Sequence, residues 1–128
     1  MQELGRITAA IAKNGSRLGQ VLSKAVSGEE IRLSEVETAL EWFITWRIKL
    51  VSPDNPFWCD GVTDLNVSVD DDETISVAAS IRIGPESDVM NIYEGVLQGI
   101  FHLNDNRNEL AAYDIFVSEN GRTYEMRS

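Results

Sequence analysis

The sequence holds one cysteine, Cys59, and one histidine, His102, in 128 residues. A single cysteine excludes an internal disulfide, and one cysteine with one histidine provides too few ligands for a typical zinc site. We therefore expect a protein of a reducing compartment, and a cytoplasmic location is the interpretation that follows. The two residues also form the only possible cysteine–histidine catalytic pair, with Asp60 as a neighbouring carboxylate that could orient the histidine.

Long apolar runs are also missing. No stretch approaches the roughly 20 apolar residues that span a bilayer, and Gln2, Glu3 and Arg6 interrupt the pattern of a signal peptide. The sequence therefore predicts no membrane association. It contains neither a GxxxxGKS/T loop nor a GxGxxG loop, which are the usual phosphate cradles. On this basis we expect no nucleotide cofactor.

Positive charge is scarce in the second part of the chain. Residues 51–128 carry four Lys/Arg against fifteen Asp/Glu, whereas residues 1–50 carry seven against six, for a formal net of −10. A negative field of this strength repels phosphate backbones, so we expect no nucleic-acid partner. The same field attracts a basic protein and accelerates its association. An acidic surface that only maintains solubility is the alternative interpretation.

Length and composition indicate one domain, because domains most often hold about 100–150 residues. A hydrophobic content of 43% with 25% charged residues is ordinary for a globular protein. The pattern along the chain divides this domain into a helical part, about residues 2–51, and a sheet-containing part, about residues 62–128.

The helical part contains two periodic segments. Apolar residues recur at three- and four-residue steps over residues 2–27, which predicts helix, and Gly28 is expected to end it. Ser34-x-x-Glu37 has the pattern of a capping box, so a second helix is predicted to start there and to end at Val51 before a proline. Residues 46–51 also alternate weakly, and this leaves a strand open at that position.

The sheet part begins with a clear two-residue period. Apolar and polar residues alternate over residues 62–83, which predicts two half-buried strands joined by the loop Asp70–Glu73. One register places every apolar side chain on one face. It sets Val69 against Ile75, Val67 against Val77 and Leu65 against Ala79.

The rest of the chain is predicted to form a helix and a second hairpin. Apolar residues over about 86–103 follow a helical period, although Gly95 and Gly99 favour a strand as the alternative. Asn120-Gly121 is a strong type I′ turn signal, and it predicts a hairpin over about 111–126. The predicted fold is therefore α+β, with N-terminal helices packed on an antiparallel sheet of two hairpins separated by a helix.

The candidate binding residues lie at the first hairpin. Its loop contains Asp70, Asp71, Asp72 and Glu73 in succession, and the preceding loop offers Trp58 and Asp60 as a nearby anchor. Carboxylates suit Ca²⁺ or Mg²⁺, but the alternating ligands and central glycine of a calcium-binding loop are absent, so we expect no metal site. A solvated turn is the simpler interpretation of the four acids.

Three functional hypotheses follow from these observations. The first is a non-enzymatic protein-binding domain, such as an immunity or inhibitor protein that engages a basic toxin through the acidic loop. The second is a small acidic chaperone of the secretion type, which would form a homodimer. The third is an enzyme that uses Cys59 and His102. The motifs in the sequence do not decide among them.

Overall fold

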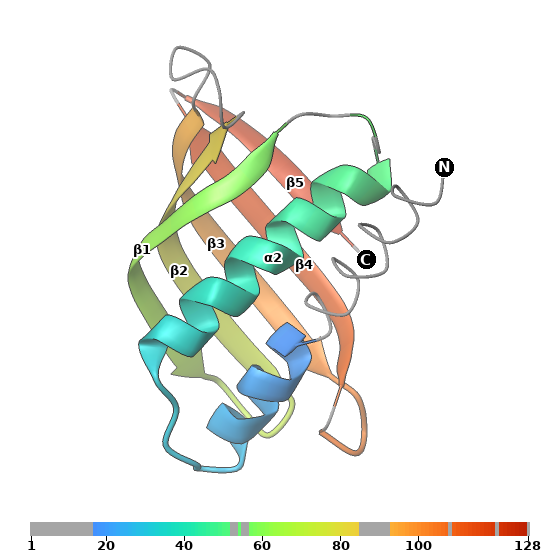
Figure 1. Ribbon diagram of the computed structural model, residues 1–128. Coiled ribbons are helices and arrows are strands. Elements are labelled where there is room, and N and C mark those ends of the chain that lie inside the picture. Colours follow the sequence, from blue (N-terminus) through green and yellow to red (C-terminus); the bar gives the residue numbers. More distant parts are fainter. Residues whose placement is uncertain are drawn as a thin grey trace.

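The computed structural model describes residues 17–51, 54, 57–84, 93–107, 109–119 and 121–127. Residues 17–26 are helical, and a longer helix and the strands follow them (Figure 1). These elements are α2 (Leu33–Val51), β1 (Trp58–Val69), β2 (Thr74–Gly84), β3 (Tyr93–Leu103), β4 (Leu110–Glu119) and β5 (Arg122–Arg127). In the part of the chain that is described, no helix is both long and apolar enough to cross a membrane.

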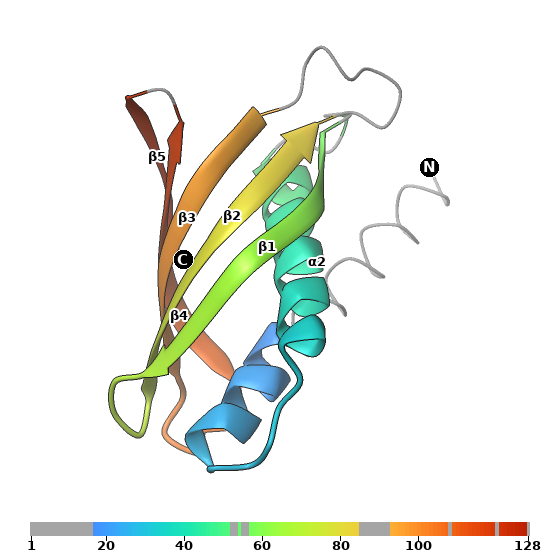
Figure 2. The ribbon, with the colours of Figure 1, turned by 90° about the vertical axis from the view of Figure 1, so that its left-hand side faces the viewer.

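The strands form one antiparallel sheet in the order β1-β2-β3-β4-β5, so each strand pairs with the next one in the sequence. Both helical elements precede the sheet and lie on the same face of it, as Figures 1 and 2 show. The fold is therefore α+β in two layers, as the sequence predicts. The opposite face of the sheet is not covered by these helices.

The core lies between α2 and the sheet. Phe43 is at its centre, with its ring centroid 4.9 Å from that of Tyr113, 6.0 Å from that of Phe101 and 5.4 Å from that of Trp46. The helical period places further apolar residues of α2 on the same side. The fully buried members of this core include Val36, Leu40, Ile44, Ile75, Leu97 and Ile115.

The helical residues 17–26 add further contacts to the core. Leu18 and Leu22 are fully buried, and Gly19 lies so close to β4 that a Cβ atom would come within 2.8 Å of the backbone nitrogen of Leu110. Gly28 has a φ of 78°, the left-handed conformation that commonly ends a helix. The predicted end of this helix is confirmed, while residues 1–16 of the prediction lie outside the described part.

The second helix starts slightly earlier than predicted. The backbone carbonyl of Arg32 accepts hydrogen bonds from Glu35 and Val36, so the helix begins at Leu33 and Ser34 lies within its first turn. Arg32 is therefore the N-cap, and the predicted cap at Ser34 is wrong by two positions. The helix continues to Val51, which resolves the open question of residues 46–51 in favour of helix.

The first hairpin has the predicted register near its loop. Val69 lies opposite Ile75 and Val67 opposite Val77, as expected. Leu65 does not pair directly with Ala79, because a bulge separates the pairs on either side, and Asp64 in this bulge has a φ of 52°. A bulge places two residues opposite one and bends the strand. β1 also begins at Trp58 and so includes the end of the segment predicted as a loop.

The predicted helix over 86–103 is wrong for residues 93–103, which form the central strand β3, while 86–92 lie outside the described residues. The two glycines fit this strand. A Cβ atom on Gly95 would lie 2.8 Å from the backbone oxygen of Ser118, and one on Gly99 would lie 2.8 Å from the Phe101 ring. Glycine in a strand often marks such a close approach.

The second hairpin is confirmed residue by residue. Pairing across Gly121, whose φ is 78°, sets Ile115 against Met126 and Asp114 against Arg127. The last pair forms an ion pair at 3.6 Å. Because β3 joins the two hairpins through hydrogen bonds to both β2 and β4, they belong to one continuous sheet.

Candidate functional site

Acidic side chains from two loops gather at one end of the sheet. The β1–β2 loop and the β3–β4 loop are neighbours because Thr74 pairs with His102, and the backbone N–H of Leu103 donates to the carbonyl of Glu73 at 2.8 Å. All six carboxylate residues of the two loops are exposed. We call this set the acidic tip: Asp70, Asp71, Asp72, Glu73, Asp105 and Glu109.

The β1–β2 loop is held in a defined conformation. The backbone N–H groups of Asp70 and Asp71 donate to the carbonyl of Thr74 at 2.9 and 3.3 Å. The Asp71 carboxylate accepts from the backbone N–H of Glu73 at 2.9 Å, and the Asp70 carboxylate accepts from the Ser76 hydroxyl. The N–H of Glu73 lowers the pKa of Asp71 because it stabilises the charged form. Asp71 thus stays ionised at neutral pH.

Arg107 is the one basic residue within these two loops. Its guanidinium lies 3.0 Å from the Asp72 carboxylate, and both side chains are largely exposed. An exposed ion pair of this kind contributes little to stability, but it does join the two loops. With one cation against six carboxylates, the two loops carry a formal charge of −5.

The acidic tip does not form a cation site in this structure. Among the described residues, no three His, Cys, Asp or Glu side chains converge closely enough to hold a metal ion. Two of the carboxylates are instead engaged with Ser76 and Arg107. The exposed carboxylates give the acidic tip a negative charge, which attracts positive charge from outside the protein.

Trp58 and Asp60, which the sequence placed near the acidic loop, lie at the other end of the sheet. Nine residues of β1 lie between Asp60 and Asp70, and at about 3.3 Å per residue the two are about 30 Å apart. The Trp58 ring meets Trp42 edge to face at 6.1 Å, and the Lys49 ammonium lies 4.9 Å from its centre. The structure therefore divides the predicted binding residues into two separate groups.

Cys59 and His102 are equally far apart. Cys59 pairs with Ile83 at one end of β2, whereas His102 pairs with Thr74 at the other, about 30 Å away. Burial raises the pKa of the Cys59 thiol to about 12. The backbone N–H of Cys59 donates to the buried Thr45 hydroxyl at 3.0 Å, which connects β1 to α2. The pair proposed for catalysis thus does not form in this structure.

We predict that Cys59 is unreactive in the native protein. With the pKa of its thiol near 12, thiolate at mildly alkaline pH is roughly a thousandfold scarcer than for an ordinary cysteine, and only the thiolate is nucleophilic. A chromogenic disulfide reagent should react slowly with the folded protein and fast after urea denaturation. Equal rates in the two states would contradict the buried position of Cys59.

The sequence did not indicate Asp105 and Glu109 as part of the site. Asp105 lies within the polar segment 104–108 and Glu109 directly follows it, after a stretch that was predicted to be a helix. A helix would have directed the chain elsewhere. Their position next to Asp70–Glu73 depends on β3 being a strand paired with β2. The remaining signal in the sequence was the presence of two acids, Asp105 and Glu109, within six residues.

Comparisons with protein-family models, with curated protein sequences and with solved structures gave no match for this chain. The functional argument therefore depends on the geometry and charge of the described residues.

Proposed function

We propose that this protein is a non-enzymatic binding domain that engages a basic protein partner through the acidic tip, in the manner of an immunity or inhibitor protein. The observation that carries the proposal is the gathering of six exposed carboxylates from two loops, with Arg107 as their one internal counter-ion. A partner with lysine and arginine side chains supplies the missing positive charge. The single cysteine is compatible with a cytoplasmic site of action.

Charge at the end of a sheet acts mainly on the rate of association. Complementary charges steer a diffusing partner into position and raise the association rate constant by a factor of roughly 10 to 1,000. The hydrogen bonds of Asp70 and Asp71 hold the β1–β2 loop in one conformation before the partner arrives. Less conformational entropy is then lost on binding.

The test uses two variants with equal loss of charge. The tip variant carries Asp71→Asn and Glu73→Gln; it keeps the Asp70–Ser76 and Asp72–Arg107 contacts, and an asparagine oxygen can still accept from residue 73. The control variant carries Asp54→Asn and Glu119→Gln, which lie outside the acidic tip. Wild type and both variants are used for affinity capture from the native host at low and high salt.

We expect wild type and the control variant to capture one basic protein at low salt and to lose it at high salt. The tip variant should capture it on the order of tenfold less strongly, because two of the charges that attract the partner are gone. Equal capture by all three proteins would refute a role for the acidic tip. Capture of no protein under either condition would refute the proposed function itself.

A further inference from the structure

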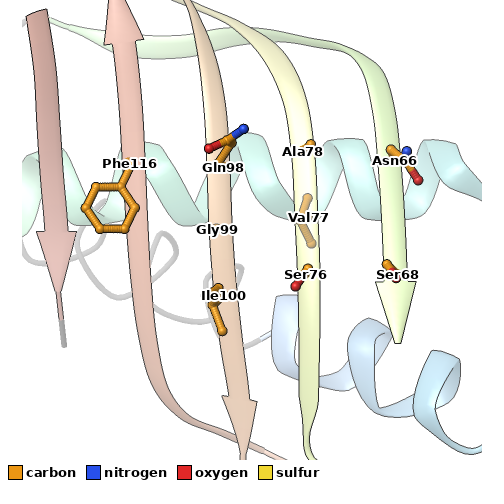
Figure 3. A pocket seen from close by; sticks show the side chains of 9 residues that line it. All are labelled: Asn66, Ser68, Ser76, Val77, Ala78, Gln98, Gly99, Ile100 and Phe116. Atoms are coloured by element: carbon orange, nitrogen blue, oxygen red, sulfur yellow. The ribbon is translucent and has the colours of Figure 1, made fainter. Parts of the chain in front are cut away.

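Among the described residues, no element covers the face of the sheet that points away from α2; we call it the outer face. Figure 3 views it with α2 behind the sheet. Residues that pair across neighbouring strands point to the same face of the sheet. The outward-pointing residues therefore form rows that run across the strands. The two central rows contain Asn66, Ala78, Gln98 and Phe116 in one and Ser68, Ser76, Ile100 and Asp114 in the other.

The centre of the outer face is hollowed, and the residues that line the hollow are uncharged. Ser76 and Ala78 on β2 are small, whereas Ile100 and Phe116 on the next two strands are large, and a hollow of about 390 Å³ lies among them. Ile100 is 42% exposed, and Val96, two rows away along β3 beyond Gln98, is 51% exposed. Exposed apolar surface around a hollow, as at Ile100 and Phe116, is typical of an interaction surface.

Carboxylates surround this uncharged centre. Six acids lie on the outer face or at its margin against two arginines, a formal net of −4. Both arginines are already engaged, Arg82 with Asp60 at 3.8 Å and Arg127 with Asp114 at 3.6 Å and with Glu125. The six acids are Asp60, Asp64, Asp70, Glu94, Asp114 and Glu125.

We propose that the outer face is the docking surface for the basic protein that the acidic tip attracts, an inference that rests on the proposed function. The chemistry of the face specifies the partner's surface: an apolar or aromatic side chain that enters the hollow, encircled by lysines and arginines. Protein interfaces usually consist of apolar anchor residues at the centre and polar residues around them.

The acidic tip and the outer face are continuous. The Asp70 carboxylate belongs to the tip and accepts from the Ser76 hydroxyl, and Ser76 lines the hollow. From strand spacings of about 4.8 Å and a rise of about 3.3 Å per residue, the outer face covers on the order of 600 Å². A standard interface buries about 800 Å² on each partner, which the face and the tip together can provide.

A second copy of this chain fits the outer face poorly. Two such faces in contact would set six carboxylates against six, with no free cation among the outward-facing residues that the structure describes. Juxtaposed like charges cost several kcal/mol across an interface. Charge therefore selects a basic partner over self-association.

The test uses isotopically labelled full-length protein and a basic amphipathic peptide of lysine and leucine as the probe. A peptide with glutamate in place of lysine and a lysine–leucine peptide without an apolar face serve as controls. Amide NMR shifts report where each peptide binds. Ile100→Lys places a cation beside the hollow, and Leu50→Lys is the matched control because Leu50 is an exposed apolar residue, 57% accessible, on α2.

We expect the basic amphipathic peptide alone to shift the amides around Ser76, Ala78, Ile100 and Phe116. Ile100→Lys should weaken its binding on the order of tenfold, which is typical of an interface anchor, and Leu50→Lys should leave it unchanged. The amide spectrum of each variant shows that it is folded.

Other results would overturn the inference in distinguishable ways. Shifts confined to the 70–73 and 104–109 loops would leave the acidic tip as the whole interface, so the proposed function would stand without the outer face. Equal binding of the glutamate peptide would contradict a basic partner. Outer-face shifts that grow with protein concentration in the absence of peptide would assign the face to a second copy of the chain. Absence of binding at low salt would contradict both proposals.

Discussion

Replacing Phe43 by alanine is expected to lower the free energy of unfolding by about 3–5 kcal/mol, the range for buried aromatic residues. Phe43 is 1% exposed and packs on three other aromatic rings, one on its own helix and two on the sheet. Its loss would leave a cavity between the two layers. Since total stabilities are about 5–15 kcal/mol, the variant should be close to unfolding at moderate temperature. Urea denaturation followed by circular dichroism measures the change.

The control for this prediction is Leu50→Ala on the same helix. Leu50 is 57% exposed, so the substitution should change the free energy of unfolding by no more than about 0.5 kcal/mol. A loss for Phe43→Ala as small as that for Leu50→Ala would mean that α2 does not pack on the sheet as described.

Gly95→Ala is expected to destabilise the protein by about 1–3 kcal/mol, as other overpacked positions do. The new Cβ atom would lie 2.8 Å from the backbone oxygen of Ser118, and a backbone atom cannot move aside without disturbing the pairing of β3 with β4. In a helix the same substitution would stabilise by roughly 1 kcal/mol, so the sign of the effect distinguishes strand from helix.

Gly61→Ala provides the comparison within the sheet. Its Cβ atom would meet only the Cβ of Arg82 at 3.4 Å, which is an ordinary contact. We expect little change in the urea midpoint for Gly61→Ala and a clear decrease for Gly95→Ala. An increase for Gly95→Ala would show that residues 93–103 are not in the strand described here.

The hairpins were predictable because their information is local. Asn120-Gly121 is a turn signal, and the pairs on either side of it match apolar residues on one face and opposite charges on the other, as with Asp114 and Arg127. The bulge around Asp64 was not predictable, since nothing in the alternating pattern indicates an extra residue.

β3 was missed because it carries apolar residues on both faces. Leu97 and Phe101 are buried against α2 and its neighbours, while Val96 and Ile100 point to the outer face and are exposed. A strand with apolar residues on both sides has no two-residue alternation, and its pattern then resembles that of a helix. The glycines were the better indicator, although the contact that requires Gly95 is with Ser118 on β4 and is not visible in the sequence of β3.

The candidate site was predicted in part for the same reason. The acids of residues 70–73 are adjacent in the sequence, so their shared loop was visible, whereas Asp105 and Glu109 join them only through the pairing of β2 with β3. Trp58 and Asp60 were grouped with the loop although the predicted strand already lay between them and Asp70. In the structure β1 runs from Trp58 to Val69, which places both residues at the far end.

The most direct test of the account is the association rate constant of the captured basic partner, measured at increasing ionic strength for wild type, the tip variant and the control variant. We predict a steep decrease with salt for wild type and the control variant. The tip variant should start on the order of tenfold lower and show a shallower dependence. Identical rates and slopes for all three proteins would contradict the claim that the acidic tip directs partner binding.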